Sequence, residues 1–98
     1  MANYYRRPWN EVRGDDQNAW GPSVWFFEVD ANGSVLRQVE QYEKGPTLGY
    51  GVDLTEDAWG GLASSALDLA EFEPYEIIAA EFEAAWAQVQ RPPPSPHQ

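Results

Sequence analysis

The sequence predicts an α+β domain with a three- to four-stranded antiparallel sheet and one long C-terminal amphipathic helix packed on one face. Residues 23–43 contain two runs rich in β-branched and aromatic residues on either side of a turn sequence, which is typical of a β-hairpin. Residues 74–90 place apolar side chains at three- and four-residue spacing, as an amphipathic helix does. Because 98 residues suffice for one hydrophobic core and not for two, we assign residues 1–90 to a single compact domain.

The hairpin is the clearest element. If a two-residue turn joins its strands, Glu28 faces Arg37; if Gly33 takes the left-handed position of a three-residue loop, Asp30 pairs with Ser34. We favour the second register because it makes one face nearly all apolar, with only Arg37 interrupting it. In this register one face carries Trp25, Phe27, Val29, Val35 and Val39, and the other carries Glu28, Gln38 and Glu40 with Phe26 and Leu36.

Weaker signals place the remaining elements. The stretch NYYRRPW, residues 3–9, can add a strand at the edge of the sheet, which Pro8 ends. A turn from Glu43 to Pro46 leads into TLGYG, a third strand weakened by its glycines. The helix begins either at Pro74 or only near Ala79. Its apolar stripe consists of Ile78, Phe82, Ala85, Trp86 and Val89.

The C-terminal stretch RPPPSPHQ, residues 91–98, holds four of the eight prolines and the only histidine, His97. We expect a disordered tail, and the alternative is a proline-rich recognition peptide for an aromatic groove. The sequence has no cysteine, no signal-peptide pattern and no apolar run long enough to cross a membrane. We therefore expect a soluble, cytoplasmic protein.

The segment from Trp25 to Gly45 reads W-F-F-E-V-D-x-N-G-x-V-x-R-Q-V-E-x-Y-E-x-G and is followed by GGL, EFEPYEI and EFEAAW. Over residues 4–88 this pattern resembles a family of small acidic bacterial proteins classed only as a domain of unknown function. The resemblance implies a compact α+β domain of about this length, without an established activity or assigned catalytic residues. The positions that match the family's pattern are Arg37, Glu40, Gly45, Gly61, Phe82 and Trp86.

Charge is the strongest functional signal in the sequence. The net charge is −10, and residues 45–90 contain nine carboxylates without a lysine or arginine. Such a field repels nucleic-acid phosphates and acidic membranes and attracts basic proteins. We therefore predict a protein-binding domain that docks a basic partner, as an inhibitor, an immunity-type protein or an adaptor would. The alternative is an acidic face that only keeps the protein soluble.

The predicted partner-binding residues are Asp53, Glu56, Asp57 and Trp59. Trp59 precedes two glycines, Gly60–Gly61, which we expect to form a mobile hinge. On this hinge the indole either folds back over the edge of the sheet or anchors a partner, since interface hot spots are enriched in tryptophan.

The second hypothesis is a small-ligand binder or enzyme with a pocket around Arg37, Tyr42 and Tyr50. A guanidinium on the apolar face of the hairpin must be paired, because an isolated buried charge is strongly unfavourable. We expect Arg37 to pair with a glutamate of the helix, and the alternative is that it lines an anion pocket.

No catalytic residue, cofactor or metal site is predicted, and we lean against an enzyme. Ser64 and Ser65 have no histidine in the folded region to act as a base. Asp15 and Asp16, like the acidic cluster before Trp59, carry oxygen ligands for a hard cation but lack the spacing of a calcium loop. The oligomeric state is not predicted.

Overall fold

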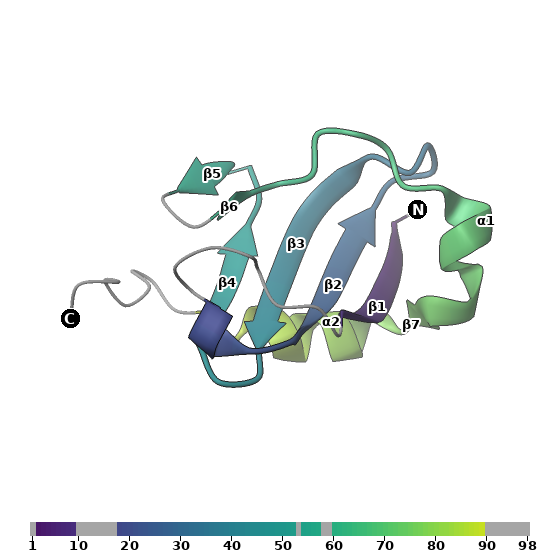
Figure 1. The fold of residues 1–98 in the computed structure, drawn as a ribbon. Coiled ribbons are helices and arrows are strands. Elements are labelled where there is room, and N and C mark those ends of the chain that lie inside the picture. The colour runs from purple at the N-terminus through teal and green to yellow at the C-terminus, as the bar shows by residue number, and fades with distance from the viewer. Residues whose placement is uncertain (1, 10–17, 53, 58–59, 90–98) are drawn as a thin grey trace.

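The computed structural model describes residues 2–9, 18–52, 54–57 and 60–89 and is built on one antiparallel sheet (Figure 1). The sheet has five strands in the order β4-β3-β2-β1-β7. These strands are β1 (Asn3–Trp9), β2 (Ser23–Val29), β3 (Val35–Tyr42), β4 (Thr47–Tyr50) and β7 (Glu76–Ile77). A second sheet consists of only β5 (Glu56–Asp57) and β6 (Gly60–Gly61). The predicted α+β class is confirmed, with more strands than expected.

The prediction of one long C-terminal helix is wrong, because the described helices are short. They are η1 (Asn18–Trp20), α1 (Leu69–Phe72), η2 (Glu73–Tyr75) and α2 (Ala79–Trp86). Pro74 occupies the first turn of η2, and the next residues, Glu76 and Ile77, pair with β1 instead of continuing a helix. None of the helices in the described residues is long and apolar enough to cross a membrane.

The strand β1 is an inner strand and not the predicted edge strand. It pairs with β2 along its whole length, Pro8 included, and with β7 at Tyr4 and Tyr5. The edge is instead the two-residue strand β7, which comes from a segment whose spacing suggested a helix. The predicted tail, residues 91–98, lies outside the described residues, as do Asp15 and Asp16.

The β2–β3 hairpin combines the two registers that the sequence allows. Near the turn Val29 pairs with Val35, and Gly33 has the predicted left-handed conformation, with φ of 85°. A β-bulge then shifts the register by one residue, so that Glu28 faces Arg37. Beyond the bulge every β3 side chain lies on the face opposite to the one expected.

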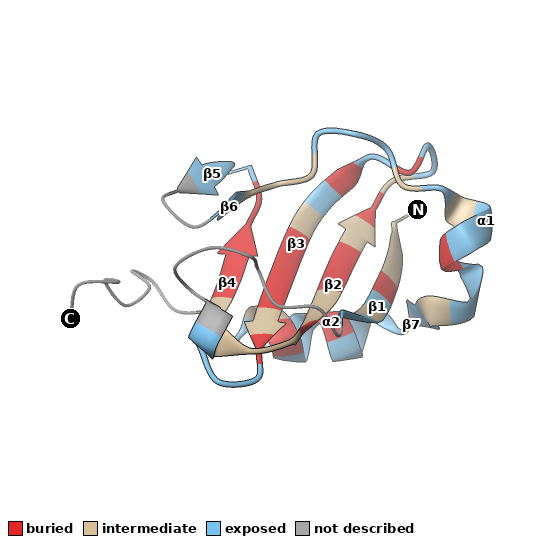
Figure 2. Cartoon of the chain, viewed as in Figure 1, coloured by how far each residue is buried: buried red, intermediate tan, exposed pale blue. Residues whose placement is uncertain are grey.

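Apolar side chains therefore pack on both faces of the sheet. The central strands β2 and β3 accordingly contain many of the buried residues, drawn red in Figure 2. On one face α2 packs Phe82 and Ala85 against Phe26 and Val39. On the other face the strap, which we define as residues 60–68, and α1 cover a cluster around Phe27 and Val29. The expected polar face is wrong, since Gln38 and Glu40 are only 1% and 3% exposed.

Candidate functional site

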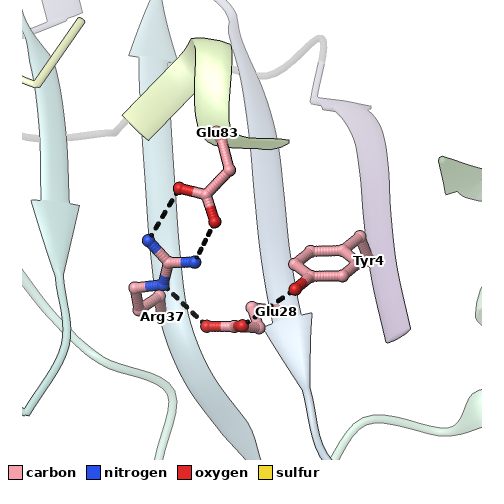
Figure 3. Close-up of polar contacts among 4 residues, drawn as sticks. All are labelled: Tyr4, Glu28, Arg37 and Glu83. Carbon is pink, nitrogen blue, oxygen red and sulfur yellow. Dashed lines mark hydrogen bonds and ion pairs between the residues drawn. The ribbon is translucent and has the colours of Figure 1, made fainter. Parts of the chain in front are cut away.

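Arg37 is held between two carboxylates from different elements (Figure 3). Its Nε donates to Glu28 Oε1 in β2 at 2.6 Å, and its two terminal nitrogens donate to Glu83 of α2 at 2.5 and 3.1 Å. The hydroxyl of Tyr4 donates to the other oxygen of Glu28 at 3.1 Å. The predicted pairing of Arg37 with a helix glutamate is confirmed.

The same guanidinium stacks on the aromatic side chains of α2. Its Cζ lies 4.8 Å from the ring centre of Phe82 and 5.0 Å from that of Trp86. Phe82 is fully buried and Trp86 partly buried, as expected for the core-facing side of the helix. With carboxylates on two sides and rings against it, Arg37 ties α2 to the sheet and offers little room for an anion.

The ionisation of this network follows from its hydrogen bonds. The bidentate bond to Glu83 raises the pKa of Arg37 further above its usual range, against the opposing effect of burial. The same bond lowers the pKa of Glu83. Partial burial, followed by the hydrogen bond to Glu28, raises the pKa of Tyr4. All three residues are therefore held in the charge states that the network needs at neutral pH.

Tyr42 and Tyr50 do not share a pocket with Arg37. Tyr50 pairs with Gln38 in the register of β3 and β4, so both tyrosines lie on the strap side of the sheet, whereas Arg37 faces α2. Both tyrosines are buried, with exposed fractions of 6% and 0%. The pocket predicted around these three residues is therefore not formed, because Arg37 and Tyr42 are five residues apart on β3 and side chains alternate between the two faces of a strand.

A buried polar row on β3 holds the strap to the sheet. The Gln38 amide nitrogen donates to Glu40 at 2.8 Å and to the Gly61 carbonyl at 3.1 Å, and the Gln38 oxygen accepts from the backbone of Ala63 at 2.9 Å. Tyr42 donates to the second Glu40 oxygen at 2.7 Å. This row was not predicted, because the expected register placed Gln38 and Glu40 on the face opposite to the apolar one.

Gly60 and Gly61 do not form the predicted hinge. They make up β6, paired with β5, and a Cβ on Gly61 would lie 2.9 Å from the carbonyl oxygen of Thr55. A Cβ on Gly60 would lie 3.3 Å from the Tyr50 hydroxyl. These glycines therefore permit close backbone approach instead of mobility.

The acidic segment is divided between the two edges of the sheet. Glu56 is exposed in β5, which follows the β4 edge, while the carboxylates after the strap lie beside β1 and β7 at the opposite edge. Asp57 is the partner of Gly60 in the small sheet. Asp53 and Trp59 lie outside the described residues. No group of metal-ligating side chains occurs within the described ranges.

An exposed apolar side chain lies among the carboxylates at the β7 edge. Ile78 is 71% exposed, although its spacing predicted a place in the core, because the helix begins only at Ala79. Exposed glutamates precede and follow it within one turn, since the Glu76 N–H bonds to the Glu73 carbonyl and the Glu81 N–H to the Ile78 carbonyl. We call Glu73, Glu76, Ile78 and Glu81 the Ile78 surface. The two adjacent β-branched residues after a proline were the signal in the sequence for this break.

Comparison with protein-family models, with curated proteins and with solved structures found no match. The resemblance to a family of small acidic bacterial proteins therefore stays a prediction. The function is proposed below from the geometry and the charges of the chain.

Proposed function

We propose that this protein is a small protein-binding domain of the cytoplasm, an inhibitor, immunity-type protein or adaptor, which docks a basic partner on the Ile78 surface. The observation that carries the proposal is the position of Ile78 at the N-cap of α2. Ser, Thr, Asp or Asn there would accept a hydrogen bond from the first turn, whereas Ile78 provides no such bond. Its side chain contributes neither to the cap nor to the core. Such a loss of stability is expected where a residue serves binding instead of the fold.

The charge around Ile78 defines the kind of partner. Within the described residues, Glu73, Glu76 and Glu81 are exposed and form no ion pair. Two basic groups of the neighbouring elements are already paired, since Arg7 lies 3.6 Å from Glu71 and Arg37 is bound by Glu83. An apolar anchor within unpaired carboxylates fits a basic surface that presents an apolar pocket.

The carboxylates predicted from the sequence support this proposal over a longer range. Asp53, Glu56 and Asp57 would add to the field that steers a basic partner, and Trp59 would provide a second anchor. These four residues are secondary in the proposal, since Ile78 carries the direct contact.

Parallel affinity capture tests the proposal. Wild type, Ile78→Ser and Val52→Ser serve as baits in a lysate of the native cell, followed by quantitative mass spectrometry. Val52 is the matched control because it is apolar and 91% exposed but belongs to no helix cap. We expect a basic protein that wild type and Val52→Ser enrich equally and that Ile78→Ser loses. Equal enrichment by all three baits would contradict the assignment of this surface.

A further inference from the structure

The end of the sheet formed by β1, β2 and β3 contains a hollow that the proposed function does not use. It has a volume of about 460 Å³. Its lining consists of Pro8, Pro22, Ser23, Val24, Gln41, Tyr42 and Glu43. Pro8, Val24 and Gln41 form one cross-strand row, and Val24 also packs on the cluster that α2 covers. This row of the lining therefore lies on the face of the sheet that α2 covers, while Ser23 and Tyr42 belong to the opposite face at the same end.

The chemistry of this lining suits a proline-rich segment in an extended polyproline conformation. The rings of Pro8 and Pro22 offer flat apolar surface to other prolines. A proline backbone has carbonyl acceptors and no N–H, so its site must supply donors. The half-buried Gln41 amide supplies them, since its side chain makes no hydrogen bond within the described part of the chain. The exposed carboxylate of Glu43 can take a flanking cation.

The sequence itself contains such a segment shortly after α2. Residues 91–96 read RPPPSP, with an arginine immediately before the prolines. Val89, the last described residue before this segment, packs against Gly49 of β4 on the α2 face. Thr47 of β4 pairs with Gln41, which lies in the row that lines the hollow.

The length of the remaining chain is sufficient to reach the whole row. The nine residues after Val89 would span roughly 28 Å in a polyproline conformation, at about 3.1 Å per residue. Crossing from β4 to Pro8 on β1 takes three strand spacings, or roughly 14 Å.

We propose that residues 91–96 of the chain dock in this hollow, with the prolines on Pro8 and Pro22 and with Arg91 paired to Glu43. The tail would then cover the face beside α2 in the same molecule. A tether this short gives an effective concentration of roughly millimolar, so weak docking suffices for the tail to be bound about half of the time.

A spin label on the full chain tests the proposal. Because the sequence has no cysteine, Gln98→Cys provides a single attachment point. We expect the label to broaden the NMR signals of the Gln41 side-chain amide and the Val24 and Glu43 backbone amides, reducing their intensities by roughly half at the occupancy given above. In the matched variant, Gln98→Cys with Pro93→Ala and Pro96→Ala, we expect the broadening at the hollow to disappear. Identical broadening in both chains, or none at the hollow, would overturn the proposal.

A mixing experiment distinguishes the chain's own tail from that of a second copy. Isotope-labelled chain without the spin label is mixed with spin-labelled chain at natural isotope abundance. We expect no broadening in the mixture, because docking is intramolecular. Broadening of the Gln41 signals there would assign the hollow to a second copy instead. Neither result bears on the Ile78 surface, which lies at the other end of β1.

Discussion

Arg37 of β3 and Glu83 of α2 form a bidentate pair across 46 residues of sequence, with hydrogen bonds of 2.5 and 3.1 Å. This pair, together with Glu28, is the polar connection between the helix that carries the Ile78 surface and the sheet. The helix has only eight residues and gains its stability from packing and from this pair. The orientation of Ile78 therefore depends on Arg37, although the two do not belong to the same site.

Replacing Arg37 should show that its role is structural. We expect Arg37→Ala to lower the free energy of unfolding by about 2–4 kcal/mol, because it leaves Glu28, whose side chain is only 15% exposed, without a cation to pair with. Arg37→Met should lose less, because an apolar chain of similar length keeps the contacts with Phe82 and Trp86. Chemical unfolding measures both variants, and equal stability of Ala, Met and wild type would contradict the role assigned to the pair.

The depressed pKa of Glu83 predicts how stability changes in acid. A carboxyl group whose folded-state pKa lies below its usual value of 4.5 stabilises the fold above that pH. This contribution is lost as the pH falls through the lower, folded-state pKa. We therefore expect the stability difference between wild type and Glu83→Gln to be largest near neutrality and to shrink in acid. In an Arg37→Met background the same substitution should show no such pH dependence in unfolding measurements.

Gln38 should hold the strap in place. Gln38→Ala removes three hydrogen bonds and leaves buried partners unsatisfied, so we expect a loss of about 3 kcal/mol. Hydrogen exchange at the Ala63 amide should accelerate by roughly tenfold or more, beyond the change at Val39 in the sheet. Gln41→Ala is the matched control on the same strand. Unchanged protection of Ala63 in Gln38→Ala would show that the strap is held by other contacts.

Gly21 and Gly33 both have positive φ, of 76° and 85°, but only Gly33 also lies very close to another backbone segment. A Cβ on Gly33 would lie 2.7 Å from the Leu67 carbonyl oxygen. A Cβ on Gly21 would meet no atom of the described residues closer than 3.7 Å. We expect Gly21→Ala to cost about 1 kcal/mol and Gly33→Ala about 2–3 kcal/mol. Thermal unfolding of the two variants decides this, and equal losses would mean that the strap yields at Leu67.

The hairpin, the turn after β3 and the helix pairing of Arg37 could be predicted because each has a local sequence signal. Turn residues at Gly33 and the cost of an unpaired guanidinium are properties of a few adjacent residues. The β-bulge could not be predicted in this way. It arises because the turn pairs Val29 with Val35, whereas the rest of the hairpin pairs Glu28 with Arg37, and the two pairings differ in register by one residue. Its one-residue shift exchanged the two faces of β3 relative to β2, which is why the expected polar face of the sheet was wrong.

The edge strand β7 was missed for a related reason. Ile78 continues the helical spacing of Phe82 and Ala85, and a spacing argument alone includes it in the stripe. The open edge of β1 provides backbone partners for Glu76 and Ile77, and these tertiary hydrogen bonds outweigh the local preference for a helix. The exposed position of Ile78 depends on this competition, so it could be seen only in the fold.

The most direct test of the central claim measures stability and binding on the same substitution. Ile78→Ser places a capping hydroxyl at the start of α2, so we expect the free energy of unfolding to rise by about 0.5–1 kcal/mol. Binding of the captured basic partner should weaken by roughly tenfold or more, mainly through faster dissociation, since a buried apolar anchor is lost. A more stable protein that binds its partner more weakly is the result predicted for a residue kept for binding. A more stable protein whose affinity for the partner is unchanged would contradict the claim that the Ile78 surface is where the partner docks.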